Sequence, residues 1–267
     1  MFVFHLELGM IRRFNLLMTL VVVSTIAHAS LSGMVRVEKN VGFPEVTRWG
    51  RNSLEIMKAM LWDPDTTSAL TESSPWVAQK MLARMNRGNV LEIGAGPGWT
   101  LTDWVAQECG KDRYFNRFDI VECNPEFYKI LQRRYTGLRK VHLYNAFFDE
   151  DWMPSRKRNK KVLYDTIIAT LPFTRLPNEA IESILKRALE LLKPGGKFIY
   201  IKLWGSTQYG KVKAFFKSLV DSDSKAPEEY DQKLNIFNSW LKRNFEVEEF
   251  LAKRNIPPLW VGIATKQ

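Results

Sequence analysis

The sequence predicts an α/β domain built on an open, mainly parallel sheet with helices on both faces, and three observations support this fold. A short apolar strand runs directly into glycines at positions 94, 96 and 98. A second apolar strand ends at an acid, Glu122, and a Pro-Gly-Gly turn at 194–196 joins an apolar helix to a late strand. Strands that alternate with helical patterns in this way indicate βαβ units and therefore a parallel sheet.

Composition fits one principal domain with a sizeable core. The chain has 267 residues, of which 45% are hydrophobic and 25% charged, and this is ordinary globular usage. The net charge of +10 predicts a surface that attracts polyanions, and both nucleic acid and an acidic lipid surface qualify. Two cysteines are too few for a disulfide framework, and His142 is the only histidine beyond the first 28 residues. We therefore expect a reducing compartment and no metal site.

The amino terminus reads as a leader that is separate from the fold. No charged residue occurs from Phe14 to Val35, and Arg12 and Arg13 stand just before this segment. A secretory signal, an organellar presequence, a poor membrane span and a true start at Met34 all fit this pattern. We expect three parts: a leader at 1–34, an N-terminal helical segment at 35–85, and the main domain at 86–267.

An amphipathic helix is predicted at 46–62 within the N-terminal segment. Its apolar side chains fall broadly on one face, and basic residues accompany them: Val46, Trp49, Ile56, Met57, Met60 and Leu61, with Arg48, Arg51 and Lys58. Such a helix suits either a membrane interface or packing against the sheet.

The first strand and its glycine loop predict a cofactor site. Strand 89–93 is followed by alternate glycines, Gly94, Gly96 and Gly98, and then by a helical pattern. The dinucleotide fingerprint would need a glycine where Trp99 stands. S-adenosylmethionine has no pyrophosphate and needs a loop that lets a ribose and an amino acid approach closely, which glycines without side chains allow. Glu92 would meet the ammonium group of this ligand, directly or through water.

The next two strands supply further candidate contacts. Glu122 ends the second strand, and a helix is expected to begin near Asn124 or Pro125. An acid at this point can accept hydrogen bonds from both ribose hydroxyls. The third strand ends at Asn145, whose amide, with the backbone of Ala146, is expected to read an adenine. Two phenylalanines follow at 147 and 148, and they either flank the base or belong to the core.

A stiff loop follows the fourth strand, which is predicted at 163–169. The sequence Ala169-Thr-Leu-Pro-Phe-Thr-Arg-Leu-Pro177 stops the strand, because proline cannot continue a ladder of hydrogen bonds. The fifth strand is expected to begin after the Pro-Gly-Gly turn.

Residues 88–204 resemble the class I S-adenosylmethionine-dependent methyltransferases, since the glycine loop, the second acid and the Pro-Gly-Gly turn occur in that family's order and spacing. The resemblance implies a Rossmann-like sheet of seven strands. It also places the cofactor at the carboxyl ends of the first strands.

The loop Thr170-Leu171-Pro172-Phe173 resembles the Asn-Leu-Pro-aromatic motif of methyltransferases that act on amino groups. It implies that Thr170, Leu171 and Phe173 are catalytic: a backbone carbonyl and the side chain at 170 accept from the amine, and Phe173 offers its π-face. Threonine replaces the usual Asn or Asp, which counts against a nucleobase substrate. The alternative role for the loop is a turn that is packed by Phe173.

Residues 45–267 are similar to the bacterial phospholipid N-methyltransferases in the outer stretches DPDTTSALTESSP, TLPFTRLP and RNIPPLWV. This similarity implies methylation of a phosphatidylethanolamine headgroup by a cytoplasmic protein bound to the inner face of an anionic membrane. It carries over Glu92, the three glycines and Glu122 as cofactor contacts, and it places Ser73 or Ser74 near the cofactor.

Transfer to an alkylamine requires the neutral amine, whose conjugate acid has a pKa of about 10.4. Tyr209, Glu72 and Asp165 are the candidate proton acceptors, and the sequence does not rank them. Phe173 and Trp204 are expected to face the methylated, cationic intermediates.

Two other functions remain open at this point. One is an RNA adenine methyltransferase or an organellar relative that acts in ribosome assembly, which the leader and the positive charge also fit. The other is a non-catalytic protein that binds the cofactor and a partner. The basic run at 156–161 is either a solvated loop or a contact to anionic headgroups or RNA phosphates.

Overall fold

The computed structural model describes residues 73–111, 115–155, 162–173, 176–203, 226–252 and 259–267. The leader and the helix predicted at 46–62 lie outside these residues. So do Glu72, Tyr209, Trp204 and the basic run at 156–161. The domain boundaries predicted at 34/35 and 85/86 stay predictions.

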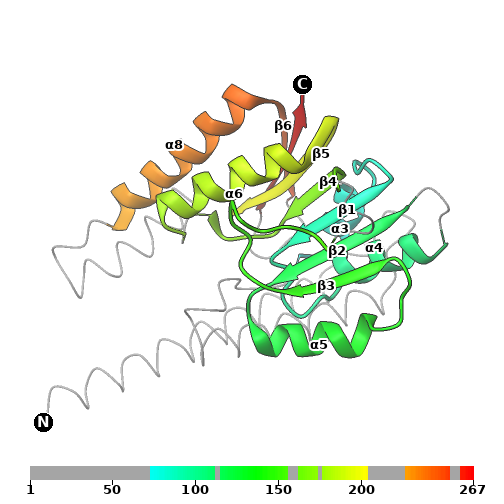
Figure 1. Cartoon of the computed structure of the whole chain (residues 1–267). Helices are drawn as coiled ribbons and strands as arrows, with labels where there is room; N and C mark the ends of the chain where they lie inside the picture. The colour runs from blue at the N-terminus through cyan, green and yellow to red at the C-terminus, as the bar shows by residue number, and fades with distance from the viewer. Residues whose placement is uncertain (1–72, 112–114, 156–161, 174–175, 204–225, 253–258) are drawn as a thin grey trace, which may run out of the picture. The chain divides into compact units, whose positions relative to one another are not determined.

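Seven strands form one mixed sheet in the order β3-β2-β1-β4-β5-β7-β6 (Figure 1). β1 to β5 run parallel, and β7 pairs antiparallel with both β5 and β6. The strands are β1 (Asn89–Ile93), β2 (Arg117–Glu122), β3 (Val141–Asn145), β4 (Tyr164–Ala169), β5 (Leu192–Leu203), β6 (Phe245–Ala252) and β7 (Leu259–Lys266).

Helices cover both faces of the sheet. The helices are α3 (Pro75–Leu82), α4 (Leu101–Lys111), α5 (Pro125–Tyr135), α6 (Asn178–Leu191) and α8 (Ala226–Asn244). Buried side chains of α3, α4 and α5 share one core cluster with one face of the strands. Those of α6 and α8 share a second cluster with the opposite face, as Figure 1 shows. The predicted Rossmann-like sheet of seven strands with helices on both faces is confirmed.

The start of α5 follows from its sequence. Asn124 is the N-cap, and its side-chain oxygen accepts from the backbone N–H groups of Glu126 and Phe127 at 2.9 and 3.2 Å. Pro125 occupies the first turn, where its missing N–H costs nothing. The helix therefore begins where the sequence predicted it, directly behind the end of β2.

The Pro-Gly-Gly segment differs from its prediction. It was expected as a turn before the fifth strand, but β5 already begins at Leu192, which pairs with Tyr164. The register then shifts, and the next pair is Thr166 with Lys197. Gly195 has a φ of 70°. The segment is thus an irregularity within β5, because the chain pairs with β4 on both sides of it.

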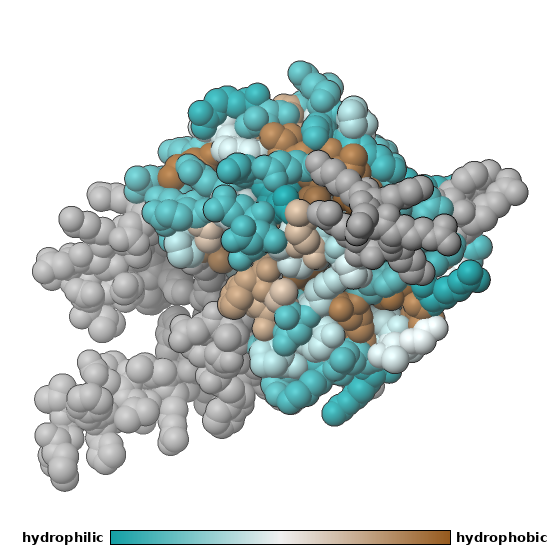
Figure 2. Space-filling model, viewed as in Figure 1, coloured by the Kyte–Doolittle hydropathy of each residue, from teal (hydrophilic) through white to brown (hydrophobic). Residues whose placement is uncertain are grey.

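The described surface is mainly polar. The face in Figure 2 is mainly hydrophilic where it is not grey, and its hydrophobic areas are separate. Large hydrophobic side chains that are exposed in the described residues are Leu138, Phe147 and Met153. Within the described part of the chain, no helix combines the length and apolar character needed to cross a bilayer.

We predict that Asp119→Ala lowers the free energy of unfolding by about 3 kcal/mol, because it removes one partner of a buried ion pair. Asp119 is 0% exposed, accepts from Arg117 Nε at 2.7 Å, and accepts from the Tyr164 hydroxyl. Urea unfolding measures the change. Lys129→Ala, which breaks the exposed pair with Glu126, is the control and should cost less than about 1 kcal/mol. Equal losses in the two variants would contradict the prediction.

Candidate functional site

The glycine loop sits at the carboxyl end of β1, and its three alternate glycines have different neighbours. All have positive φ, of 74° at Gly94, 59° at Gly96 and 71° at Gly98. A Cβ at Gly94 would lie 2.5 Å from Leu171 Cδ2, and one at Gly98 would lie 2.2 Å from Leu131 Cδ2. A Cβ at Gly96 would meet nothing within 4 Å. Packing therefore requires glycine at the first and third positions, whereas the space beside Gly96 is open.

The amides of the loop are turned toward the protein. Gly94 N–H donates to the Val121 carbonyl at 2.9 Å, and Gly98 N–H donates to the Ala95 carbonyl at 3.1 Å. Gly96 N–H donates to Glu122 Oε2 at 2.8 Å. The loop thus differs from a phosphate cradle, in which such amides would point at the ligand.

Glu92 lies directly before the loop and is 1% exposed. Its Oε1 accepts from the Thr102 hydroxyl at 3.2 Å, while its Oε2 has no hydrogen-bond partner in the described structure. Burial raises the pKa of Glu92 to about 8, and the Thr102 hydrogen bond opposes that rise. A buried carboxyl group with a free oxygen suits a cationic ligand group, which would favour its charged form.

Glu122 ends β2 and binds the loop. Its two oxygens accept from Gly96 N–H at 2.8 Å and from Asn124 N–H at 2.7 Å. Burial raises the pKa of Glu122, and these two backbone hydrogen bonds oppose the rise. The sequence predicted both oxygens as ribose ligands. In the structure each oxygen already holds one backbone donor, so a ribose would use the remaining lone pairs.

The end of β3 lies beside the end of β2. Asn145 pairs with Glu122 in the sheet, and its Nδ2 donates to the carbonyls of Glu122 and Cys123 at 2.9 and 3.2 Å. The Asn145 side-chain NH₂ group, which was predicted to help to read an adenine, therefore holds the end of β3 to the end of β2. Ala146 is partly buried against the core. Phe147, which follows it, is 76% exposed and available to a ligand.

Phe148 belongs to the core, which settles one of the alternatives for this residue. It is 6% exposed, and its ring centroid lies 5.1 Å from that of Trp152. Of the two phenylalanines that follow β3, only Phe147 is exposed enough to stack on a base.

The serines before α3 have different positions. Ser74 is 0% exposed and is the N-cap of the helix, where its hydroxyl accepts from Val77 N–H at 3.4 Å. Ser74 therefore fixes the start of α3. Ser73 is partly buried just before it.

The loop after β4 is attached to the glycine loop. Thr170 N–H donates to the Ile93 carbonyl at 3.2 Å, and the Thr170 hydroxyl donates to the Gly94 carbonyl at 2.8 Å. Leu171 covers Gly94, and its carbonyl accepts from Phe173 N–H at 3.0 Å. Thr170 and Leu171 thus lie beside the glycine loop, with the threonine oxygen still able to accept a hydrogen bond.

The ring of Phe173 was predicted to face the acceptor, but in the structure it is buried in the core. It is 4% exposed, and its ring centroid lies 4.5 Å from Phe237 and 6.5 Å from Phe198. The ring packs between Phe237 of α8 and Phe198 of β5 and is therefore part of the core. The alternative role of the loop, a stiff turn packed by Phe173, is the one that these contacts support.

Asp165 is also corrected. It lies at the start of β4, at the edge of the sheet opposite the glycine loop, and it accepts from Asn89 N–H at 2.8 Å. Its Oδ2 is 2.7 Å from Lys193 Nζ. Asp165 therefore lies at the amino ends of the parallel strands, away from the glycine loop. Of the three proton acceptors proposed from the sequence, Tyr209 and Glu72 lie outside the described residues.

Two side chains at the site had no signal in the sequence. Thr102, the second residue of α4, donates to Glu92. The Tyr135 hydroxyl, at the end of α5, contacts the Gly98 carbonyl and lies 2.7 Å from Asp103 Oδ1. Both contacts arise from the packing of helices onto the sheet, so a local motif could not reveal them.

No group of three or more metal-ligating side chains occurs in the described part of the chain. The two cysteines form no disulfide: Cys109 is buried and Cys123 is exposed.

No family model matches the chain. Two curated fungal synthases match parts of it. The highly reducing polyketide synthase easB of Emericella nidulans is 31% identical over 124 residues, which is 46% of this chain and 5% of the synthase. The hybrid PKS-NRPS synthetase iccA of Talaromyces variabilis is 24% identical over 167 residues, covering 60% of this chain and 4% of the synthetase. The chain thus spans about one twentieth of the length of these relatives.

The arrangement of strands is shared with a solved structure, that of N-methyltransferase NodS from Bradyrhizobium japonicum WM9 in complex with S-adenosyl-l-homocysteine. The TM-score is 0.51 at 11% identity, and the match covers 80% of this chain and 98% of NodS. The fold is that of the S-adenosylmethionine-dependent methyltransferases of class I. At this identity the likeness establishes the fold alone.

We predict that Gly98→Ala costs about 3 kcal/mol of unfolding free energy and Gly96→Ala about 1 kcal/mol. Both alanines take a positive φ, but only the one at 98 meets another side chain. Chemical denaturation of the two variants measures the difference, which reports the contacts of the added Cβ at 98 with Leu131 and Tyr135. A larger loss at 96 than at 98 would show that this account of the loop is wrong.

We predict that Glu92 makes the unliganded protein less stable as the pH rises from about 5 to 8. Its pKa is about 8 in the folded chain against an ordinary 4.5, so the folded state holds a proton that the unfolded state has lost. The free energy of unfolding then falls by up to about 1.4 kcal/mol per pH unit.

The measurement is urea unfolding across this pH range for the wild type and Glu92→Gln. The variant has no proton to lose, so its stability should change less with pH. Glu246→Gln, at an exposed glutamate of β6, is the control and should keep the wild-type slope. An unchanged slope in Glu92→Gln would refute the assignment.

Proposed function

We propose that the chain is an S-adenosylmethionine-dependent methyltransferase. The observation that carries the proposal is the open space beside Gly96, where an added Cβ would meet no protein atom within 4 Å. Glu122 contacts Gly96 directly, and Glu92 is close enough to Glu122 for their charges to interact. Two buried acids disfavour a phosphate and favour a ligand with a positive charge and with hydroxyl donors.

The residues present fit this cofactor. Glu92 Oε2, which has no partner in the described structure, would accept from the ligand's ammonium group. Glu122 would accept from the ribose, and the exposed ring of Phe147 would pack on the adenine. When bound, the cofactor supplies a methyl group that is already activated on a sulfonium, so the chain has to align the acceptor and exclude water.

We further propose that the acceptor is an amine of the phosphatidylethanolamine type at an anionic membrane surface on the cytoplasmic side. Three observations support this choice. The net charge of +10 favours an anionic surface. Thr170 replaces the amide or acid that would hold a planar base amine, and its hydroxyl hydrogen is already donated to the Gly94 carbonyl. The fold match, NodS, is an N-methyltransferase.

Thr170 and Leu171 are the chain's contribution at the acceptor. The oxygen of Thr170 can accept a hydrogen bond from the amine, beside the loop where the methyl group would lie. Leu171 and neighbouring apolar side chains would lower the pKa of the amine by removing water from around it. A neutral amine in line with the methyl group is what the transfer needs.

Cofactor binding is tested by calorimetry with S-adenosylhomocysteine on the wild type and Gly96→Arg. We predict that the variant loses at least about 100-fold in affinity, because its side chain fills the open space. Gly137→Arg is the matched control, since Gly137 also has a positive φ and no neighbour within 4 Å but follows α5. Equal affinity in the wild type and Gly96→Arg would exclude this site, and circular dichroism checks that each variant folds.

The acceptor is tested with labelled methyl groups. Protein is incubated with phosphatidylethanolamine vesicles that contain phosphatidylglycerol, and separately with ribosomal RNA. We predict label in the lipid fraction and a rate that rises with pH, because the neutral amine becomes more abundant. Label in RNA alone would contradict the lipid acceptor and support an adenine acceptor. Absence of label in both fractions, with cofactor binding intact, would support a non-catalytic role.

A further inference from the structure

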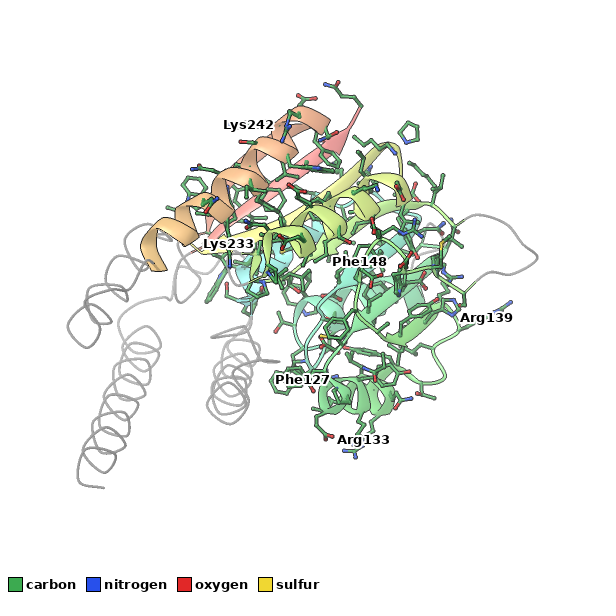
Figure 3. All side chains as sticks on the ribbon, turned by 60° about the vertical axis from the view of Figure 1, so that its left-hand side comes forward. Phe127, Arg133, Arg139, Phe148, Lys233 and Lys242 are labelled. Carbon is green, nitrogen blue, oxygen red and sulfur yellow. The ribbon has the colours of Figure 1, made fainter. Side chains whose placement is uncertain are left out.

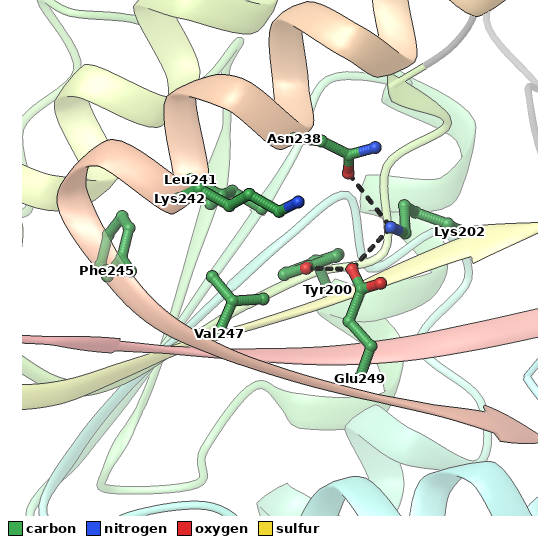
Figure 4. Close-up of a pocket in the computed structure, with 8 residues that line it drawn as sticks. All are labelled: Tyr200, Lys202, Asn238, Leu241, Lys242, Phe245, Val247 and Glu249. Carbon is green, nitrogen blue, oxygen red and sulfur yellow. Dashed lines mark hydrogen bonds and ion pairs between the residues drawn. The ribbon is translucent and has the colours of Figure 1, made fainter.

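A pocket lies between β5, β6 and α8, with a volume of about 350 Å³ (Figure 4). In the sheet, β5 is two strands from β1 and β6 is four, so the pocket is separate from the glycine loop. The ring of Phe237 stands between Tyr200, which lines the pocket, and Phe173 of the loop after β4, with centroids 5.0 Å and 4.5 Å from them respectively. The volume is at the lower end of the range for small-molecule sites.

The polar floor of the pocket is a connected group of side chains. Glu249 Oε1 accepts from the Tyr200 hydroxyl and from Lys202 Nζ, both at 2.5 Å. Lys202 also donates to Asn238 Oδ1 at 3.1 Å, and its side chain is 13% exposed. Burial and Glu249 raise the pKa of Tyr200, so the phenol keeps its proton and acts as a donor. The charge of Glu249 is thus matched by Lys202.

Lys242 adds a positive charge that the floor does not balance. It lines the pocket from α8, and its Nζ points toward Asn238 and Lys202 in Figure 4. Among the residues that the structure describes, no acidic side chain pairs with it. Two ammonium groups face one carboxylate, and the site therefore carries a net positive charge. Charge-assisted hydrogen bonds from such groups favour an anion.

The remaining wall is apolar and consists of Leu241, Phe245 and Val247. Gly262 helps to shape the floor, because it lies opposite Tyr200 in the sheet and a Cβ there would meet the phenol ring at 2.1 Å. A ligand held by the lysines would place a short hydrocarbon part against this wall.

We propose that this pocket binds a small organic anion, with a phosphate or carboxylate group between Lys202 and Lys242 and a short apolar chain against Leu241, Phe245 and Val247. The site is independent of the methyl transfer proposed above, because its residues belong to other strands. A free metabolite and the headgroup region of an anionic lipid share this chemistry.

The test is a calorimetric titration of the full chain with hexyl phosphate and with hexanoate. We expect binding of both, and a loss of about tenfold in affinity in Lys242→Gln, the effect of losing one charge-assisted contact. Lys242→Arg should retain binding. Lys233→Gln is the matched control, because Lys233 lies on the same helix and does not line the pocket (Figure 3).

Saturation with S-adenosylhomocysteine should leave the affinity for hexyl phosphate unchanged. Absence of binding in the wild type, an equal loss in Lys233→Gln, or competition by S-adenosylhomocysteine would overturn the proposal. The source of the anion is decided by vesicles of phosphatidylcholine with and without phosphatidic acid. Competition with hexyl phosphate by the anionic vesicles assigns the pocket to a lipid headgroup, and its absence assigns the pocket to a free anion.

Discussion

The hydrogen bonds at the carboxyl end of β1 are the interaction on which the rest of the site depends. The Gly94 N–H group donates to the Val121 carbonyl of β2. Thr170, directly after β4, donates its N–H to the Ile93 carbonyl and its hydroxyl to the Gly94 carbonyl. The turn is thereby held from both sides by strands that are far apart in the sequence. Because these hydrogen bonds hold the loop in place, the position of the open space beside Gly96 is set by the neighbouring strands.

The position of β1 inside the sheet explains why the side chain of Glu92 is buried. Its strand is central, and side chains at its level meet α4 on one face of the sheet. Burial removes water from the Glu92 carboxyl group, which is unfavourable for its charged form. The hydrogen bond from the Thr102 hydroxyl offsets only part of this cost. A cationic ligand group would favour the charged form of Glu92, and the carboxyl group already in place would need little rearrangement to meet it.

Sequence reasoning succeeded where the signal was local. The glycine loop, the acid that ends β2 and the cap at Asn124 depend on residues within a few positions of one another, and the structure has each of them. It failed for Phe173 and Asp165, whose surroundings are set by segments distant in the sequence. An aromatic after a proline looks the same whether α8 covers it or not, and an acid within a strand does not reveal which edge of the sheet holds it.

The difference among the three glycines has a consequence for comparing related chains. Gly94 and Gly98 are demanded by packing against leucines, so a descendant that had abandoned the cofactor would still need both. A Cβ at Gly96 would meet no protein atom, so within the fold only its positive φ favours glycine there. If the proposed cofactor site is correct, substitution of the middle glycine would accompany loss of the cofactor, whereas the flanking pair would persist with the sheet.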